Sequence, residues 1–131
     1  LLSEKIIFED FTTPLLIPIP ASRSKERERG YNQTLLIAEA MTSKDAENLF
    51  TLETATLVKI RETKQQASLK DKQEREENVR GAFGVAISKN ITGRNIILLD
   101  DVITSGSTMR EARKIITENG ARKVLCLALA H

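Results

Sequence analysis

The sequence predicts an α/β fold with a mostly parallel sheet flanked by helices. Short apolar segments alternate with segments of helical periodicity along the chain. One of them, residues 96–99, contains no polar residue, which is typical of a strand buried on both faces of a parallel sheet. Parallel strands need crossover connections, and the intervening helices supply them. The chain has 131 residues, enough for one core, so we predict a single domain over residues 1–131.

The first half of the chain predicts a strand, a helix and a second strand. Residues 15–20 form an apolar strand whose exit is marked by prolines, because proline cannot donate to a sheet ladder. Asn32 is a candidate N-cap for a helix that continues to Met41. Apolar residues lie on most faces of this helix, which indicates burial against the sheet. Residues 56–60 predict the second strand.

A polar stretch follows at residues 61–80, where only Ala67, Leu69 and Val79 are apolar. Such a stretch can bury little surface. It therefore predicts a mobile loop that leads into a solvated helix at residues 71–78.

The last part of the chain predicts two further strands and a helix. Residues 82–87 and 123–130 have apolar strand patterns. Residues 107–119 have helical periodicity, with Gly120 as the C-terminal stop. The sequence at residues 108–111, Thr-Met-Arg-Glu, fits the capping-box pattern and marks the start of this helix. The apolar stripe of the helix consists of Met109, Ala112, Ile115 and Ile116.

Composition favours a soluble protein of the cytoplasm. Hydrophobic residues make up 40% and charged residues 29%, as in ordinary globular proteins. A net charge of +2 is too small to indicate nucleic-acid binding by itself. We expect no membrane span and no signal peptide, because no apolar stretch has the required length. Cys126 is the only cysteine, which excludes a disulfide scaffold and predicts a core thiol.

The segment that most clearly indicates a ligand site spans residues 96–108. An apolar strand ends in Asp100 and Asp101, and a loop rich in hydroxyl groups then opens a helix. Ligands of open α/β sheets bind at the carboxyl ends of strands, and the first amides of a helix bind phosphate. An ordinary strand–loop–helix junction is the alternative. A Walker B strand would need a partner glycine-rich loop ending in Gly-Lys-Ser or Gly-Lys-Thr, which the sequence lacks.

This run resembles the 5-phosphoribosyl-1-pyrophosphate (PRPP) motif of type I phosphoribosyltransferases. The resemblance implies that Asp100 and Asp101 hold the two ribose hydroxyls. It also implies a cradle for the 5-phosphate, formed by Thr104, Ser105, Gly106, Ser107 and Thr108.

Three further segments resemble the ComF family of type I phosphoribosyltransferase-like proteins. Ile-Pro-Ile-Pro at residues 17–20 precedes Arg-Gly-Tyr-Asn-Gln at residues 29–33. Arg-Glu-Thr-Lys-Gln-Gln follows at residues 61–66, and Arg-Glu-Glu-Asn-Val at residues 75–79 lies just before an Ala-Phe strand. The family usually carries an N-terminal cysteine-rich zinc module, whose cysteines this sequence lacks. The sequence is therefore either a fragment or a member without the module, and structural zinc has no support.

The resemblance implies a phosphoribosyltransferase that binds PRPP with Mg²⁺ and transfers phosphoribose to a nitrogen acceptor with release of pyrophosphate. No residue identifies the acceptor, and a dimer stays open. Asp100 and Asp101 are the expected protein neighbours of Mg²⁺, through water, because the ion would be held mainly by substrate oxygens. The alternative is a PRPP-binding protein without catalysis that serves regulation or DNA uptake, since the family is linked to natural competence and its proteins.

A second anion site is expected for the pyrophosphate. The turn formed by Ala21, Ser22 and Arg23 offers an anion nest, and Arg29 is the candidate for stabilising the departing pyrophosphate. A solvated charged surface is the alternative for this basic run. In type I enzymes the stretch after the second strand is a flexible hood, which implies that residues 61–80, the hood segment, bring Arg61 or Lys64 to the site. A disordered loop without a catalytic residue is the alternative.

Overall fold

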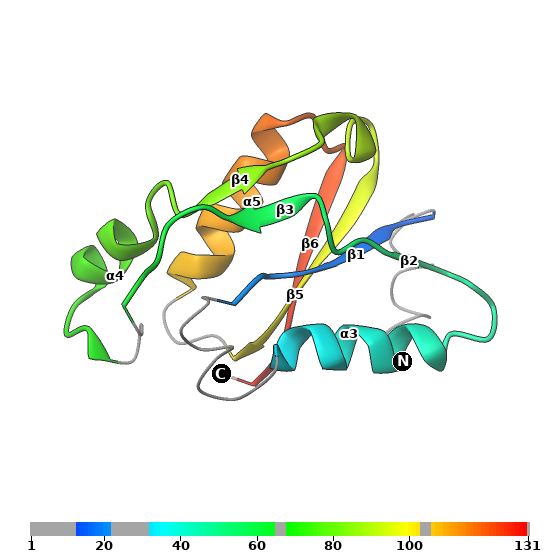
Figure 1. Ribbon diagram of the computed structural model, residues 1–131, viewed down its shortest axis with the longest axis horizontal. Coiled ribbons are helices and arrows are strands. Elements are labelled where there is room, and N and C mark those ends of the chain that lie inside the picture. The colour runs from blue at the N-terminus through cyan, green and yellow to red at the C-terminus, as the bar shows by residue number, and fades with distance from the viewer. Residues whose placement is uncertain (1–12, 22–31, 65–67, 103–105, 131) are drawn as a thin grey trace.

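The computed structural model describes residues 13–21, 32–64, 68–102 and 106–130. A four-stranded sheet in the order β2-β1-β5-β6 forms its centre (Figure 1). Neighbouring strands of this sheet are all parallel, which confirms the prediction of a mostly parallel sheet. The strands are β1 (Leu15–Pro18), β2 (Thr51–Leu52), β5 (Asn95–Val102) and β6 (Lys123–Ala130).

The two central strands divide the core into two layers. Leu15 pairs with Ile96 and Leu16 with Ile97 in the register of β1 and β5. Successive strand residues face opposite sides, so Leu15 and Ile96 pack in one apolar cluster while Leu16 and Ile97 pack in the other. Both faces of the sheet are therefore covered, as its continuously apolar strands require.

Helix α5 (Ser107–Glu118) covers one face of the sheet. Met109, Ala112 and Ile116 are buried and Ile115 is partly buried, which confirms the predicted apolar stripe. Gly120 follows the helix with a φ of +98°, a conformation that glycine adopts without strain, so the expected C-terminal stop is confirmed.

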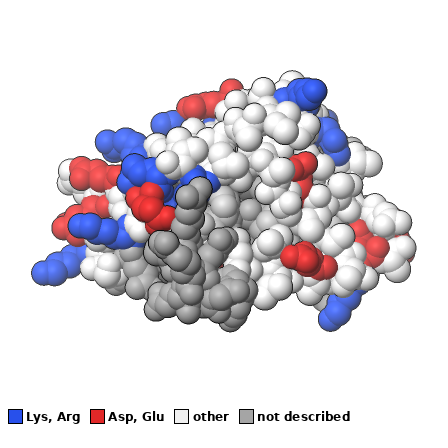
Figure 2. Space-filling model, viewed as in Figure 1, with Lys and Arg blue, Asp and Glu red and all other residues white. Residues whose placement is uncertain are grey.

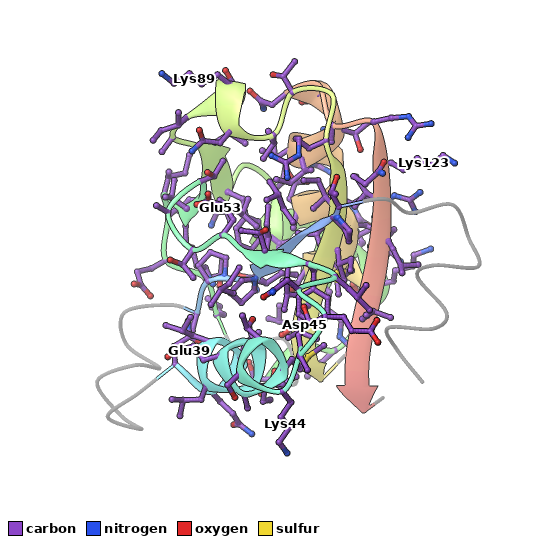
Figure 3. The ribbon with its side chains drawn as sticks, turned by 90° about the vertical axis from the view of Figure 1, so that its right-hand side faces the viewer. Glu39, Lys44, Asp45, Glu53, Lys89 and Lys123 are labelled. Atoms are coloured by element: carbon purple, nitrogen blue, oxygen red, sulfur yellow. The ribbon has the colours of Figure 1, made fainter. Side chains whose placement is uncertain are left out.

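Helix α3 (Gln33–Ser43) covers the opposite face, and the exposed side chain of Lys44 just beyond it points away from the sheet (Figure 3). The Asn32 side chain accepts a hydrogen bond from the Leu35 amide at 3.2 Å, which confirms the predicted N-cap. The expected burial against the sheet is confirmed, although for one side of the helix only. Its buried residues are Thr34 and Ala38, because only one side of the helix meets the sheet.

The predicted strands at residues 56–60 and 82–87 do not join the parallel sheet. They form β3 (Leu57–Lys59) and β4 (Phe83–Val85), an antiparallel pair that makes a separate two-stranded sheet. The connection between them includes helix α4 (Lys72–Val79), where Val79 is the buried residue. Because α4 buries so little, it cannot cover a sheet face as the helix of a parallel crossover does. The strand that follows it, β4, pairs antiparallel with β3.

The β3–β4 pair still belongs to the main core. Leu57 and Phe83 are buried in the same cluster as the α5 stripe. Helix α4 projects beyond this pair, and charged side chains of both signs gather over it (Figures 1 and 2). Asp71 caps the helix by accepting a hydrogen bond from the Glu74 amide at 2.8 Å, as the predicted start at residue 71 requires. Within the described ranges, none of the helices has the length and apolar character needed to cross a membrane.

Candidate functional site

The acidic pair lies at the carboxyl end of the central strand β5. The sequence suggested that the strand ends in Asp100 and Asp101, but β5 continues one residue further, to Val102. Both are partly buried, and the Asp101 amide donates to Asp100 Oδ1 at 2.9 Å. Alternation along the strand places Asp100 in the row of Leu98, on the α5 side. The packing of β5 in the core therefore fixes the positions of these two carboxylates at the edge of the sheet.

Helix α5 begins at the same edge with an unusual N-terminus. Its N-cap is Gly106, with a φ of +81° and no side-chain hydrogen bond to cap the first turn. The predicted capping box is wrong: Thr108 lies inside the helix, and the Glu111 carboxylate accepts from the Gly81 amide at 3.3 Å. A left-handed glycine starts the helix two residues before the pattern suggested. Gly106 has no side chain with which to cap the first turn, and the first amides of a helix are donors that suit an anion.

Arg110 covers this N-terminus, although sequence reasoning did not select it. A Cβ added at Gly106 would lie 2.9 Å from Arg110 Nη1, so the guanidinium occupies the space beside the glycine. Arg110 Nη2 donates to Ser107 Oγ at 3.4 Å. The signal was available, because helical side chains lean toward the N-terminus and cover the turn before their own Cα.

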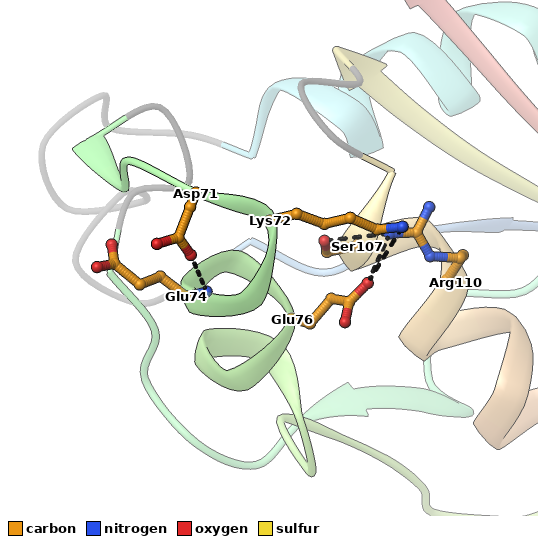
Figure 4. A network of polar contacts seen from close by, with 6 residues as sticks. All are labelled: Asp71, Lys72, Glu74, Glu76, Ser107 and Arg110. Carbon is orange, nitrogen blue, oxygen red and sulfur yellow. Dashed lines mark hydrogen bonds and ion pairs between the residues drawn. The ribbon is translucent and has the colours of Figure 1, made fainter.

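The same guanidinium reaches across to helix α4. Arg110 Nη2 lies 3.4 Å from Glu76 Oε1, and Lys72 Nζ lies 3.9 Å from that oxygen (Figure 4). The side chains of Arg110 and Glu76 are 54% and 43% exposed, so water screens this ion pair. The site thus borders a charged contact between two helices that are far apart in sequence.

Arg61 and Lys64, the candidates in the hood segment, make their contacts with other residues of that segment. Arg61 Nη2 donates to the Asn78 carbonyl at 2.7 Å and to the Arg80 carbonyl at 2.6 Å. The Lys64 amide donates to Asn78 Oδ1 at 2.9 Å, and Asn78 Nδ2 donates to the Lys64 carbonyl at 2.8 Å. Arg61 therefore holds the C-terminal end of α4 here, and a catalytic role for Arg61 or Lys64 stays a prediction.

The structure describes only one of the remaining site candidates, Ala21. Ala21 follows β1, whose Pro18 is paired with Leu99, so the chain leaves β1 at the same edge of the sheet as Asp100. The other candidates fall outside the described residues, namely Ser22, Arg23, Arg29, Thr104 and Ser105.

The donor atoms at this edge fit a magnesium ion that takes most of its ligands from elsewhere. Carboxylate oxygens of Asp100 and Asp101 are the hard donors that Mg²⁺ prefers. The described residues include no group of at least three histidine, cysteine, aspartate or glutamate side chains that could hold a metal. Two carboxylates suit an ion that keeps water and substrate oxygens in its coordination shell, as Mg²⁺ does.

A family model described as "Phosphoribosyl transferase domain" matches residues 37–131. The chain is 33% identical over 117 residues to "Competence protein F" of Haemophilus influenzae, covering 88% of this chain and 49% of that protein. It is 33% identical over 106 residues to "Competence protein ComFC" of Bacillus subtilis, covering 81% of this chain and 39% of that one. The chain thus spans half or less of the length of these curated relatives.

A solved structure supports the fold. The chain resembles the glutamine phosphoribosylpyrophosphate (PRPP) amidotransferase of B. subtilis, with a TM-score of 0.53 and 20% identity. The match covers 88% of this chain and 22% of that one. At this identity the likeness concerns the fold alone, and it agrees with the predicted type I phosphoribosyltransferase-like architecture.

Proposed function

The chain belongs to the phosphoribosyl transferase domain family, as a ComF-type member, and we propose that it binds PRPP with Mg²⁺ and transfers phosphoribose to a nitrogen acceptor. One observation carries the proposal. The acidic pair on β5 and the N-terminus of α5, whose N-cap is Gly106, lie at the same edge of the sheet. A ribose phosphate needs acceptors for its hydroxyls and donors for its phosphate, and this edge offers both.

Each part of the site has a defined task in this proposal. Asp100 and Asp101 accept hydrogen bonds from the ribose hydroxyls, and charge makes these bonds stronger than neutral ones. The first turn of α5, from Gly106 to Thr108, binds the 5-phosphate together with Thr104 and Ser105. These contacts fix the ribose ring, so that C1 faces the acceptor.

The reaction breaks the bond between C1 and the pyrophosphate oxygen, and that electron pair leaves with pyrophosphate. The acceptor nitrogen donates a pair to C1 and gives its proton to solvent. The transition state resembles an oxocarbenium ion, so positioning and charge neutralisation matter more than a covalent nucleophile. Ala21, Ser22, Arg23 and Arg29 would face the leaving group. Mg²⁺, beside Asp100 and Asp101, would neutralise pyrophosphate charge when bound.

A second candidate function is PRPP binding without catalysis, in regulation or in DNA uptake. Arg61 favours it, because this hood cation is engaged with two backbone carbonyls of the hood segment itself. The names of the relatives describe competence proteins and give no transfer reaction. Both candidates place the protein in the cytoplasm, with PRPP as the ligand and with competence proteins as candidate partners.

Pyrophosphate release distinguishes the two functions. The protein is incubated with PRPP and Mg²⁺, and release is followed across a panel of nitrogenous acceptors, after calorimetry has measured PRPP binding. Release with one acceptor supports the enzyme, and replacement of Arg29 by alanine should then lower turnover more than affinity. Binding without release for any acceptor replaces the enzyme by the binding protein. Absence of PRPP binding contradicts both.

A further inference from the structure

We propose that Arg110 is a further ligand of the 5-phosphate and that Glu76 competes with this phosphate for its guanidinium. The inference rests on the proposed function of the site. It adds a residue that lies outside the loop of the motif, and it links the occupancy of the phosphate site to helix α4.

The geometry places the guanidinium beside the position expected for the phosphate. Arg110 Nη1 lies in the space beside Gly106, 2.9 Å from the position of an added Cβ. Arg110 Nη2 reaches Ser107 Oγ in the first turn of α5. A phosphate on the first amides of this helix would therefore lie against the guanidinium, whose fork of N–H groups matches phosphate oxygens.

The contact with Glu76 can be exchanged at low cost. Both partners of the Arg110–Glu76 pair are about half exposed, and such pairs contribute little to stability. A phosphate monoester carries up to about two negative charges at neutral pH, whereas a carboxylate carries one. The phosphate should therefore draw the guanidinium away from Glu76, which keeps its neighbour Lys72 at 3.9 Å (Figure 4).

Competition of this kind couples two parts of the chain. Arg110 belongs to α5 and Glu76 to α4, which lies in the hood segment. If phosphate weakens the contact between the helices, then loss of the contact must strengthen phosphate binding by the same factor. The coupling requires only that the Arg110 guanidinium exchanges its contact with Glu76 for one with the phosphate.

The test measures ribose 5-phosphate binding by calorimetry at fixed ionic strength. Arg110→Gln and Lys72→Gln each remove one positive charge and one ion pair with Glu76, but only Arg110 also contacts Ser107 and the space beside Gly106. We expect about tenfold weaker binding for Arg110→Gln, the size of one charge-assisted hydrogen bond, and less than about twofold for Lys72→Gln. Arg110→Lys keeps the charge without the fork and should lie between them.

A second pair of variants tests the competition. Glu76→Gln should tighten binding about twofold to threefold, because the competing carboxylate is gone. Glu77→Gln removes the same charge one residue further on, from a side chain that bonds Gln73, and should change affinity less. In the Arg110→Gln background, Glu76→Gln should bring no gain beyond that of Glu77→Gln.

The outcomes separate the inference from the proposed function. Equal losses of ribose 5-phosphate affinity in Arg110→Gln and Lys72→Gln would show that only the total positive charge near the site matters. That result would overturn the inference. So would an unchanged affinity in Arg110→Gln with melting temperature preserved. In both cases the parent still binds ribose 5-phosphate, and the proposed function stands. A parent that binds neither ribose 5-phosphate nor PRPP overturns both.

Discussion

The two regions around the candidate site are held in place by different forces. Residues 96–99, which lead to the acidic pair, are at most 1% exposed, and they pack in both layers of the core. In the described part of the hood segment only Val79 is buried, and polar contacts of Arg61 and Asn78 connect its ends. Core packing thus positions the acidic pair, whereas exposed hydrogen bonds position the hood segment. The packed strand should therefore tolerate few substitutions, whereas the hood segment should rearrange easily.

The largest effect is expected at Gly106. Its φ of +81° strains any residue with a Cβ, and a side chain there would displace Arg110. Gly106→Val should therefore abolish ribose 5-phosphate binding, while the buried sheet keeps the fold. Calorimetry and thermal melting measure the two effects. Binding equal to that of the parent would show that the phosphate cradle lies elsewhere.

Replacement of the acidic pair should have the next largest effect. Asp100→Ala with Asp101→Ala removes two acceptors for the ribose hydroxyls, each worth about 1.5–3 kcal/mol as charge-assisted hydrogen bonds. PRPP affinity should fall at least about tenfold. Inorganic phosphate binding should change much less, because the N-terminus of α5 is intact. Unchanged PRPP affinity would contradict the assignment of these carboxylates.

A smaller effect should appear in the hood segment, without any mutation. Its described amides have few buried apolar neighbours, so we expect low hydrogen-exchange protection in the free protein. PRPP with Mg²⁺ should raise protection at residues 61–64 and 68–80 and leave β5 unchanged. Equal protection of these residues in the free and bound states would indicate a static segment without a hood role.

Much of the sheet could be predicted, because burial leaves a local pattern. The apolar runs of β1 and β5 and the stripe of α5 identified their elements, and Asn32 marked the start of α3. The positions of the acidic pair and of Gly106 could also be predicted locally, since a strand end and a helix start adjoin in sequence, and their role in binding stays a prediction.

The remaining features depend on contacts between distant residues. Nothing in β3 or β4 specifies which strand each one pairs with, so their separate antiparallel sheet was missed. The pattern of Thr108 and Glu111 fits a capping box, but Gly106 starts the helix earlier and Glu111 binds the Gly81 amide. Glu76 and Arg110 are 34 positions apart, so only the folded chain brings them together.

The smallest effect concerns the thiol on β6. It tests whether the packed sheet stays unchanged when ligand binds. Cys126 pairs with Leu98 of β5, and burial raises the pKa of its thiol, while the positive charge of Arg113 lowers it by less. A raised pKa means less thiolate at pH 8, so alkylation by iodoacetamide should be slower than in the urea-unfolded chain. Arg113→Gln should slow it further, whereas Lys114→Gln, a matched loss of charge on the same helix, should change it less. PRPP should leave the rate unchanged, because β6 belongs to the packed sheet. A ligand-dependent rate would show that the sheet also rearranges, and the contrast between the two regions would then be wrong.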